Sequence, residues 1–141
     1  MSDTTEPLTE SQPIVVGFVP TAQGHAAVDA AVVHAQRWET GVVVVNSAHG
    51  AYMDSQLATR SDLEQVRRQV EAAGVSVEIH QLAESQDPVS AVIDLVEQVD
   101  ARMLVIGLRR RSPVGKFLMG STAQSLLQHS PVPVLAVKST S

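Results

Sequence analysis

The stretch Val105–Thr122, VIGLRRRSPVGKFLMGST, carries the strongest signal in this chain for a ligand site. An apolar run ends at Gly107, four cationic side chains follow between positions 109 and 116, and Gly120 precedes a segment with helical character. Glycine lets a ligand approach the main chain closely, and the first N–H groups of a helix lack helical partners and attract anions. The pattern indicates a phosphate-binding loop; the alternative is a surface loop whose basic residues are simply solvated.

Strands and helices are expected to alternate along the chain. Apolar, β-branched runs predict buried strands at 14–19, 42–45, 103–106 and 132–137, and the alternating run 75–82 predicts an edge strand. Amphipathic or alanine-rich segments predict helices at 24–39, 61–73, from Asp87 onward and at about 120–129. Pro133 has no N–H, so the last strand should lie at an edge. The order predicts an α/β fold: a three-layer, doubly wound, parallel five-stranded sheet, strand order 3-2-1-4-5, with helices on both faces.

Residues with capping ability mark the helix ends. Thr21 can cap the first helix, and Asp87 followed by Pro88 can start the third. Gly41 and Gly74 are expected to end the first two helices. Two acidic residues flank the connection after the second strand and could be either helix caps or metal ligands: Asp54 and Asp62.

The composition describes a water-soluble globular domain with an aliphatic core. The chain has 141 residues, of which 44% are hydrophobic and 3% aromatic, and its formal net charge is −5. It contains no cysteine, which excludes disulfides and fits a reducing cytoplasm. No apolar run approaches the ~20 residues of a membrane span, and the acidic balance argues against nucleic acid or anionic membranes as partners. The polar segment 1–13 is expected to be a disordered tail, and the domain to span 14–138.

The predicted topology puts the basic stretch where this class of fold binds ligands, beyond the carboxyl ends of the strands at the point where the strand order reverses. That point lies between the first and fourth strands. The residues there are Val19 and Pro20 after the first strand, and Gly107 onward after the fourth.

Two common phosphate-binding motifs are absent. A Walker A loop would need glycine at Arg110 and serine or threonine at Phe117. No G-x-G-x-x-G follows the first strand, so the dinucleotide fingerprint is missing as well.

A third pattern matches in part, and it resembles the universal stress protein family. Nucleotide-binding members of that family carry Gly-x-x-Gly, nine residues, and then Gly-Ser or Gly-Thr between the fourth strand and the fourth helix. Gly107 matches the first glycine, and Gly120 with Ser121 matches the final pair at the right interval. The segment 130–137 is similar to the closing strand of the family, and 14–27 to its opening strand and turn. The resemblance covers residues 14–138.

The resemblance implies a regulatory module that binds an adenine nucleotide, ATP, AMP or a cyclic nucleotide, with or without Mg²⁺. The phosphates would be surrounded by Gly107, Arg109, Arg110, Gly120, Ser121 and Thr122. The base would face the start of the loop after the second strand, near residues 44–46 and with Val45 as the contact. Hydroxyl groups at 121 and 122 would add donors to the backbone N–H groups.

Two positions depart from the family pattern. Arg110 replaces the second glycine, so its side chain would either obstruct the phosphates or supply a cation to them. Val19, followed by Pro20, stands where nucleotide-binding members usually have an aspartate that contacts the nucleoside. The family also contains members that bind no nucleotide.

Three functional hypotheses follow: a nucleotide-binding regulatory module, a dimeric stress-response interaction protein without nucleotide, and a slow ATPase. The ATPase ranks last because no general base is evident near the loop. The resemblance also implies homodimers through the strand at 132–137. No catalytic residue and no metal ligand is predicted, since the five histidines lack the spacing of a zinc site.

Overall fold

Five parallel strands form the sheet on which the fold is built. They are β1 (Ile14–Phe18), β2 (Val42–Asn46), β3 (Val77–Gln81), β4 (Met103–Arg110) and β6 (Val134–Lys138). The computed structural model describes residues 12–46, 58–82, 86–110, 117–118 and 120–138. The spatial order is β3-β2-β1-β4-β6, which confirms the predicted order 3-2-1-4-5, β6 being the fifth strand of the prediction. β1 lies at the centre, where Ile14 pairs with Val42 on one side and with Met103 on the other.

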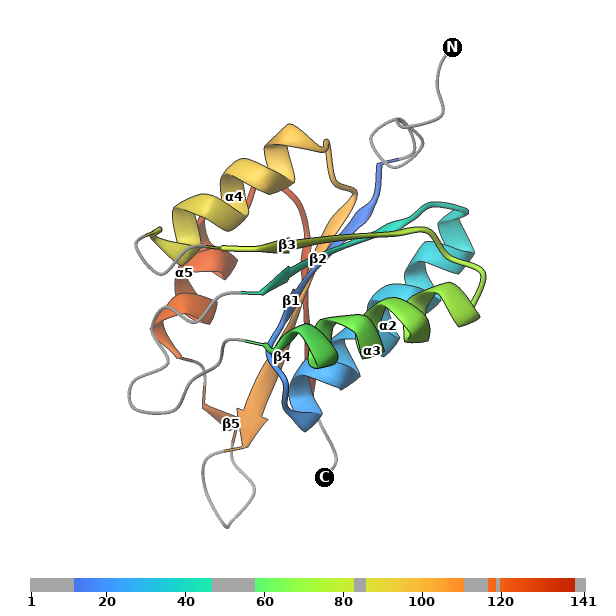
Figure 1. Cartoon of the computed structure of the whole chain (residues 1–141). Helices are drawn as coiled ribbons and strands as arrows, with labels where there is room; N and C mark the ends of the chain where they lie inside the picture. The colour runs from blue at the N-terminus through green and yellow to red at the C-terminus, as the bar shows by residue number, and fades with distance from the viewer. Residues whose placement is uncertain (1–11, 47–57, 83–85, 111–116, 119, 139–141) are drawn as a thin grey trace.

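Four helices cover the two faces of this sheet. Figure 1 shows α2 (Ala22–Trp38) and α3 (Arg60–Ala72) on one face, and α4 (Pro88–Gln98) and α5 (Ser121–His129) on the other. β1 and β2 are apolar at almost every position because both of their faces are covered. Alternate residues of each strand therefore enter one of two cores.

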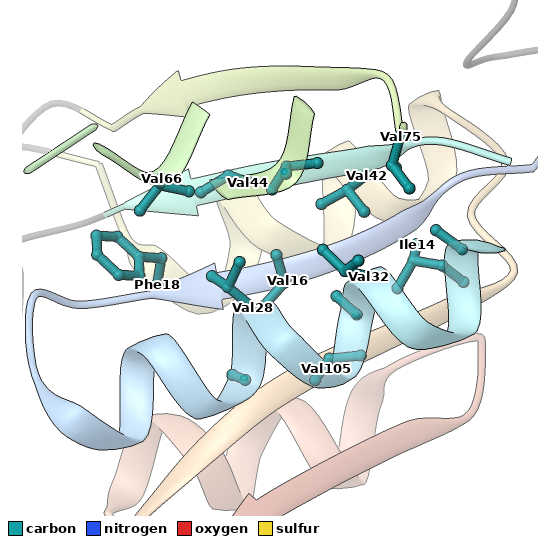
Figure 2. Close-up of a cluster of buried hydrophobic side chains, with 14 of the residues drawn as sticks. Ile14, Val16, Phe18, Val28, Val32, Val42, Val44, Val66, Val75 and Val105 are labelled. Atoms are coloured by element: carbon teal, nitrogen blue, oxygen red, sulfur yellow. The ribbon is translucent and has the colours of Figure 1, made fainter. Parts of the chain in front are cut away.

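The first core lies between the sheet and the α2–α3 pair. Figure 2 shows Val28 and Val32 of α2 packed against β1, with Phe18 near the end of that strand. Small residues of α2 are fully buried here and let the helix lie close to the sheet: Ala27, Ala31 and Ala35. The second core lies under α4 and α5 and is built around Val43, Leu104 and Val96.

Helix starts agree with the predicted caps. The Thr21 hydroxyl oxygen accepts a hydrogen bond from the Gly24 N–H, so α2 begins at Ala22 rather than at Gly24. Asp87 caps α4 in the same way, accepting from the Ser90 N–H at 2.9 Å. At α3, Thr59 and Asp62 exchange main-chain to side-chain bonds in a capping box, which assigns Asp62 a capping role. Asp54 lies outside the described residues.

The first helix ends differently from the prediction that Gly41 stops it. Glu39 takes a left-handed conformation with φ of 55°, and the Thr40 N–H bonds back to Ala35 O at 2.9 Å. Gly41 is already aligned with the sheet, where its carbonyl accepts the Ile14 N–H at 3.0 Å. Glu39 therefore does what glycine commonly does at a helix end. At the second helix, Gly74 follows the last turn with φ of +78°.

The basic stretch does not begin as a loop at Gly107, so this expectation was wrong. β4 continues to Arg110 and pairs antiparallel with β5 (Phe117–Leu118), Arg109 facing Leu118 and Arg110 facing Phe117. The pairing of β1 with β4 ends at Val105, whereas β4 extends five residues further. β5 thus pairs with the end of β4 beyond both of its parallel partners, since the pairing with β6 ends at Leu108.

The two described residues of the predicted tail are attached to the domain. Pro13 is buried and its carbonyl accepts the Arg102 N–H at 2.9 Å, while the Gln12 side chain bonds to both Asp100 and Arg102. The rest of the predicted tail, residues 1–11, lies outside the described residues. Among the helices that the structure describes, none has the length and apolarity needed to cross a bilayer.

Candidate nucleotide site at the carboxyl ends of the strands

The predicted site residues all lie toward the carboxyl ends of β1, β2 and β4 or at the start of α5. Val19 and Pro20 follow β1, Val45 lies in β2, Gly107, Arg109 and Arg110 lie in β4, and Gly120, Ser121 and Thr122 open α5. β1 and β4 are neighbours in the sheet but lead to helices on opposite faces (Figure 1). The residues are therefore grouped at the topological switch point, where the fold favours a ligand site.

The turn after β1 is tightly closed. The Val19 carbonyl accepts the Thr21 N–H at 2.7 Å, and a Cβ on Gly24 would overlap that same carbonyl oxygen. Gly24 is buried in the first turn of α2, so the absence of a side chain lets the helix start directly over Val19. The main-chain oxygen of Val19 is thus occupied by the protein.

Gly107 has a packing role that its sequence context does not reveal. A Cβ at this position would overlap Gln23 O and lie 2.9 Å from the Gln23 carbonyl carbon. The first turn of α2 therefore rests on β4 at Gly107. This contact joins β4 to the β1–α2 turn, and it accounts for glycine here without a ligand.

Gly120 differs from Gly24 and Gly107 because no close contact with a described atom requires it to be glycine. It is exposed, and a Cβ built on it would meet none of the described atoms within 4 Å. Its φ of −71° and ψ of 168° are open to any residue, so no conformational strain demands glycine. Within the described part of the chain, neither packing nor backbone conformation explains this glycine.

Gly120 is also the N-cap of α5, which leaves the helix without a side-chain cap. The sequence left open that Ser121 is merely a capping residue, but Ser121 is the first residue inside the helix. The first turn of α5 carries no acidic side chain that would neutralise the positive end of the helix dipole. Open N–H groups, an exposed Ser121 and a partly buried Thr122 form a group of donors suited to an anion.

Val45 occupies the base end of the predicted site but presents no side chain to it. Its side chain is 3% exposed and belongs to the second core. Any contact of Val45 with a ligand would therefore be made by its main chain.

The next residue, Asn46, ends the range 44–46 that was expected to face the base, but no role was predicted for its side chain. It is fully buried and is the one buried polar side chain among the residues that the structure describes. Its Nδ2 donates to Phe18 O, and its Oδ1 accepts from the Ala58 N–H and from Gln81 Nε2, each at 2.9 Å. A single asparagine at the end of a four-valine run was the available signal in the sequence. Its partners were not predictable, because they lie 12 to 35 residues away.

The described residues contain no group of three His, Cys, Asp or Glu side chains arranged to hold a metal ion. His25, in the first turns of α2, stacks edge-on against Phe18 with ring centroids 5.1 Å apart. This histidine therefore contributes to packing near the end of β1.

Comparison with known proteins agrees with this architecture. A model of the universal stress protein family matches residues 10–138. A universal stress protein of Mycolicibacterium smegmatis is 41% identical over 126 residues, which is 89% of this chain and 96% of the relative.

Solved structures show the same fold. The structure of a universal stress protein from Archaeoglobus fulgidus is 27% identical, with a TM-score of 0.74 over 90% of this chain and 98% of its own. A universal stress protein structure from the same organism in complex with dAMP is 23% identical, with a TM-score of 0.68 and the same coverage.

Proposed function

This chain belongs to the universal stress protein family, and we propose that it is a regulatory member that binds an adenine nucleotide, ATP or AMP, at the carboxyl ends of β1, β2 and β4. Gly120 is the observation that carries the proposal. It is the N-cap of a nine-residue helix, it is exposed, and no described protein atom or backbone angle requires glycine there. A ligand that approaches the main chain supplies the missing reason.

The chemistry of this position favours a phosphate. The uncapped N–H groups of α5 and the positive end of its dipole select an anion, and the hydroxyl groups of Ser121 and Thr122 add donors. Arg109 and Arg110 belong to the neighbouring strand β4 and bring positive charge to the same end of the sheet. The related structure with dAMP supports an adenine nucleotide as the source of that phosphate.

A dimeric interaction protein without nucleotide is the second candidate, and Val19 favours it. Val19 offers no carboxylate to a ribose, and its carbonyl is already bonded to the Thr21 N–H. Under both candidates we propose a cytoplasmic homodimer that pairs through β6, a strand at the end of the parallel order with four partly exposed apolar residues.

Calorimetric titration with ATP and AMP, each with and without Mg²⁺, tests whether the protein binds an adenine nucleotide. We expect saturable binding, together with adenine nucleotide that copurifies with the protein. Absence of heat at millimolar ligand overturns the proposal in favour of the second candidate.

Gly120→Val locates the site. The added side chain enters open space, so the variant should stay folded and lose only about 1 kcal/mol from the poorer N-cap. It should bind ATP at least ~10-fold more weakly, since it blocks the approach of phosphate. Gln128→Val, near the other end of the same helix and exposed, is the matched control and should bind as wild type does. Wild-type affinity in Gly120→Val would place the site elsewhere.

A further inference from the structure

A network of hydrogen bonds, which we call the Asn46 clamp, joins four chain segments around the end of β2. It consists of Asn46, Gln81, Phe18 O and the main chain of Ala58. Asn46 donates to Phe18 O and accepts from Ala58 N–H and Gln81 Nε2. Gln81 Nε2 also donates to Ala58 O at 2.9 Å, and the Leu82 N–H donates to Asn46 O at 2.9 Å. The ends of β1, β2 and β3 are thereby tied to the chain that leads into α3.

The centre of the clamp is buried, whereas Gln81 at its edge is exposed. Asn46 is 0% exposed and Ala58 4% exposed. A buried amide is costly unless its polar atoms are bonded, and here the oxygen receives two donors and the nitrogen reaches a carbonyl. The Asn46 amide is thus engaged by protein atoms, and its effect on a ligand would be indirect.

The position of the clamp relates it to the proposed site. If the phosphates are held at the start of α5 and the end of β4, the rest of the nucleotide extends over β1 toward β2. This direction follows because β1 lies between β4 and β2 in the sheet. Two strand spacings are about 10 Å, a distance that a nucleoside can span. The base then meets the end of β2 near Val45 and Asn46, which the clamp holds in place.

We propose that Asn46 and Gln81 are positioning residues that orient main-chain groups for the base and so set the preference for adenine over guanine. The inference rests on the proposed function and adds to it the residues that determine base selectivity. Main-chain donors and acceptors discriminate between bases only if their directions are held within narrow limits. The clamp supplies that constraint through hydrogen bonds between residues that are distant in sequence.

Gln81→Met is the decisive variant. It keeps the length of the side chain, removes the two bonds donated by Nε2, and changes an exposed residue of an edge strand, so the fold should persist. Calorimetric titration with ATP, GTP and tripolyphosphate separates base from phosphate. We expect ATP affinity to fall about 5- to 10-fold, tripolyphosphate affinity to stay at the wild-type value, and the ATP to GTP preference to shrink.

Gln36→Met is the matched control. Gln36 is another exposed glutamine, near the C-terminal end of α2, and its side chain donates a hydrogen bond to Ala73 O at 3.0 Å. The substitution removes this bond, which lies away from the clamp. It should leave all three affinities unchanged. Asn46→Asp is the second variant; it keeps Oδ1 but replaces the donor to Phe18 O with a buried carboxylate oxygen, so thermal melting checks the fold. We expect the same loss of base preference.

The outcomes separate the two proposals. If the wild-type protein binds ATP and the ratio of ATP affinity to GTP affinity is unchanged in Gln81→Met and Asn46→Asp, the positioning role is wrong. The proposed function would still stand. Equal weakening of ATP and tripolyphosphate also overturns it, because a general loosening of the fold would act on both. Wild-type protein that binds none of the three ligands overturns the proposed function, and the positioning role falls with it.

Discussion

Three glycines near the carboxyl ends of the strands look alike in sequence but have different physical origins. Gly24 and Gly107 are required by close contacts between main-chain segments, with Val19 and Gln23 respectively. Gly120 has no such neighbour among the described atoms. At the scale of single residues, the distinction separates positions that maintain the fold from a position open to a ligand.

Gly107→Ala should destabilise the protein by about 1–3 kcal/mol, because its Cβ would force α2 away from β4. Urea unfolding followed by circular dichroism measures the change. Gly120→Ser, which keeps a residue favoured at an N-cap, is the control and should stay within about 0.5 kcal/mol of wild type. Equal stability of both variants would contradict the assignment of Gly107 to packing.

Arg110 tests whether the departure from the family pattern helps or hinders phosphate. Arg110→Gly should weaken ATP binding about 3- to 10-fold, with a smaller loss for AMP, because a cation contributes more where more phosphate charge is present. Calorimetry at low and high salt measures both ligands.

Glycine in a strand also weakens the strand, so Arg110→Gln serves as the companion variant and should show the same loss from removal of the charge alone. Tighter binding by Arg110→Gly would mean that the arginine obstructs the site.

At the scale of elements, the helix ends show how one residue can replace the expected one. Glu39 adopts the left-handed conformation at the end of α2, which costs a non-glycine residue about 1–2 kcal/mol. The cost is tolerated because the Glu39 N–H bonds to Ala35 O and Gln36 O and the Thr40 N–H to Ala35 O. Gly41, two residues later, could then become part of the sheet.

Glu39→Gly should therefore raise the free energy of unfolding, by about 0.5–1 kcal/mol. The expected gain is smaller than the strain because glycine makes the unfolded chain more flexible. Thermal denaturation measures the change. Glu39→Ala keeps the unfavourable Cβ and should bring no gain; stabilisation by alanine alone would show that loss of the glutamate charge is the cause.

At the scale of the whole molecule, β6 is the strand through which we expect two copies to meet. It pairs with β4, and its apolar residues are all only partly buried. Leu135 also packs against the first core. A charge at this position would disturb both the interface and the monomer.

Leu135→Thr should shift the protein toward monomer in sedimentation velocity, with at least a ~10-fold weaker association. Threonine is β-branched, which strands favour, and it removes apolar surface without adding a charge. Leu135→Glu should abolish the dimer, with far-UV circular dichroism as the check on folding. An unchanged dimer in both variants would refute the β6 interface.

Much of this molecule follows from the sequence alone. The valine-rich runs, the alternation in 75–82 and the caps at Thr21 and Asp87 are local signals, and the parallel order follows from the handedness of strand–helix–strand connections. These signals act over a few residues or apply to every chain of this class. The same topology placed the basic stretch at the end of the sheet where a ligand site is favoured.

Only the tertiary structure decided which residues approach one another across those elements. The roles of Gly24 and Gly107 depend on how closely α2 lies on β1 and β4. The antiparallel β5 pairs with the part of β4 that extends beyond both parallel partners. The Asn46 clamp joins residues up to 35 positions apart. The physical reason is that such contacts arise from register and helix–sheet packing, which no local pattern of residues specifies.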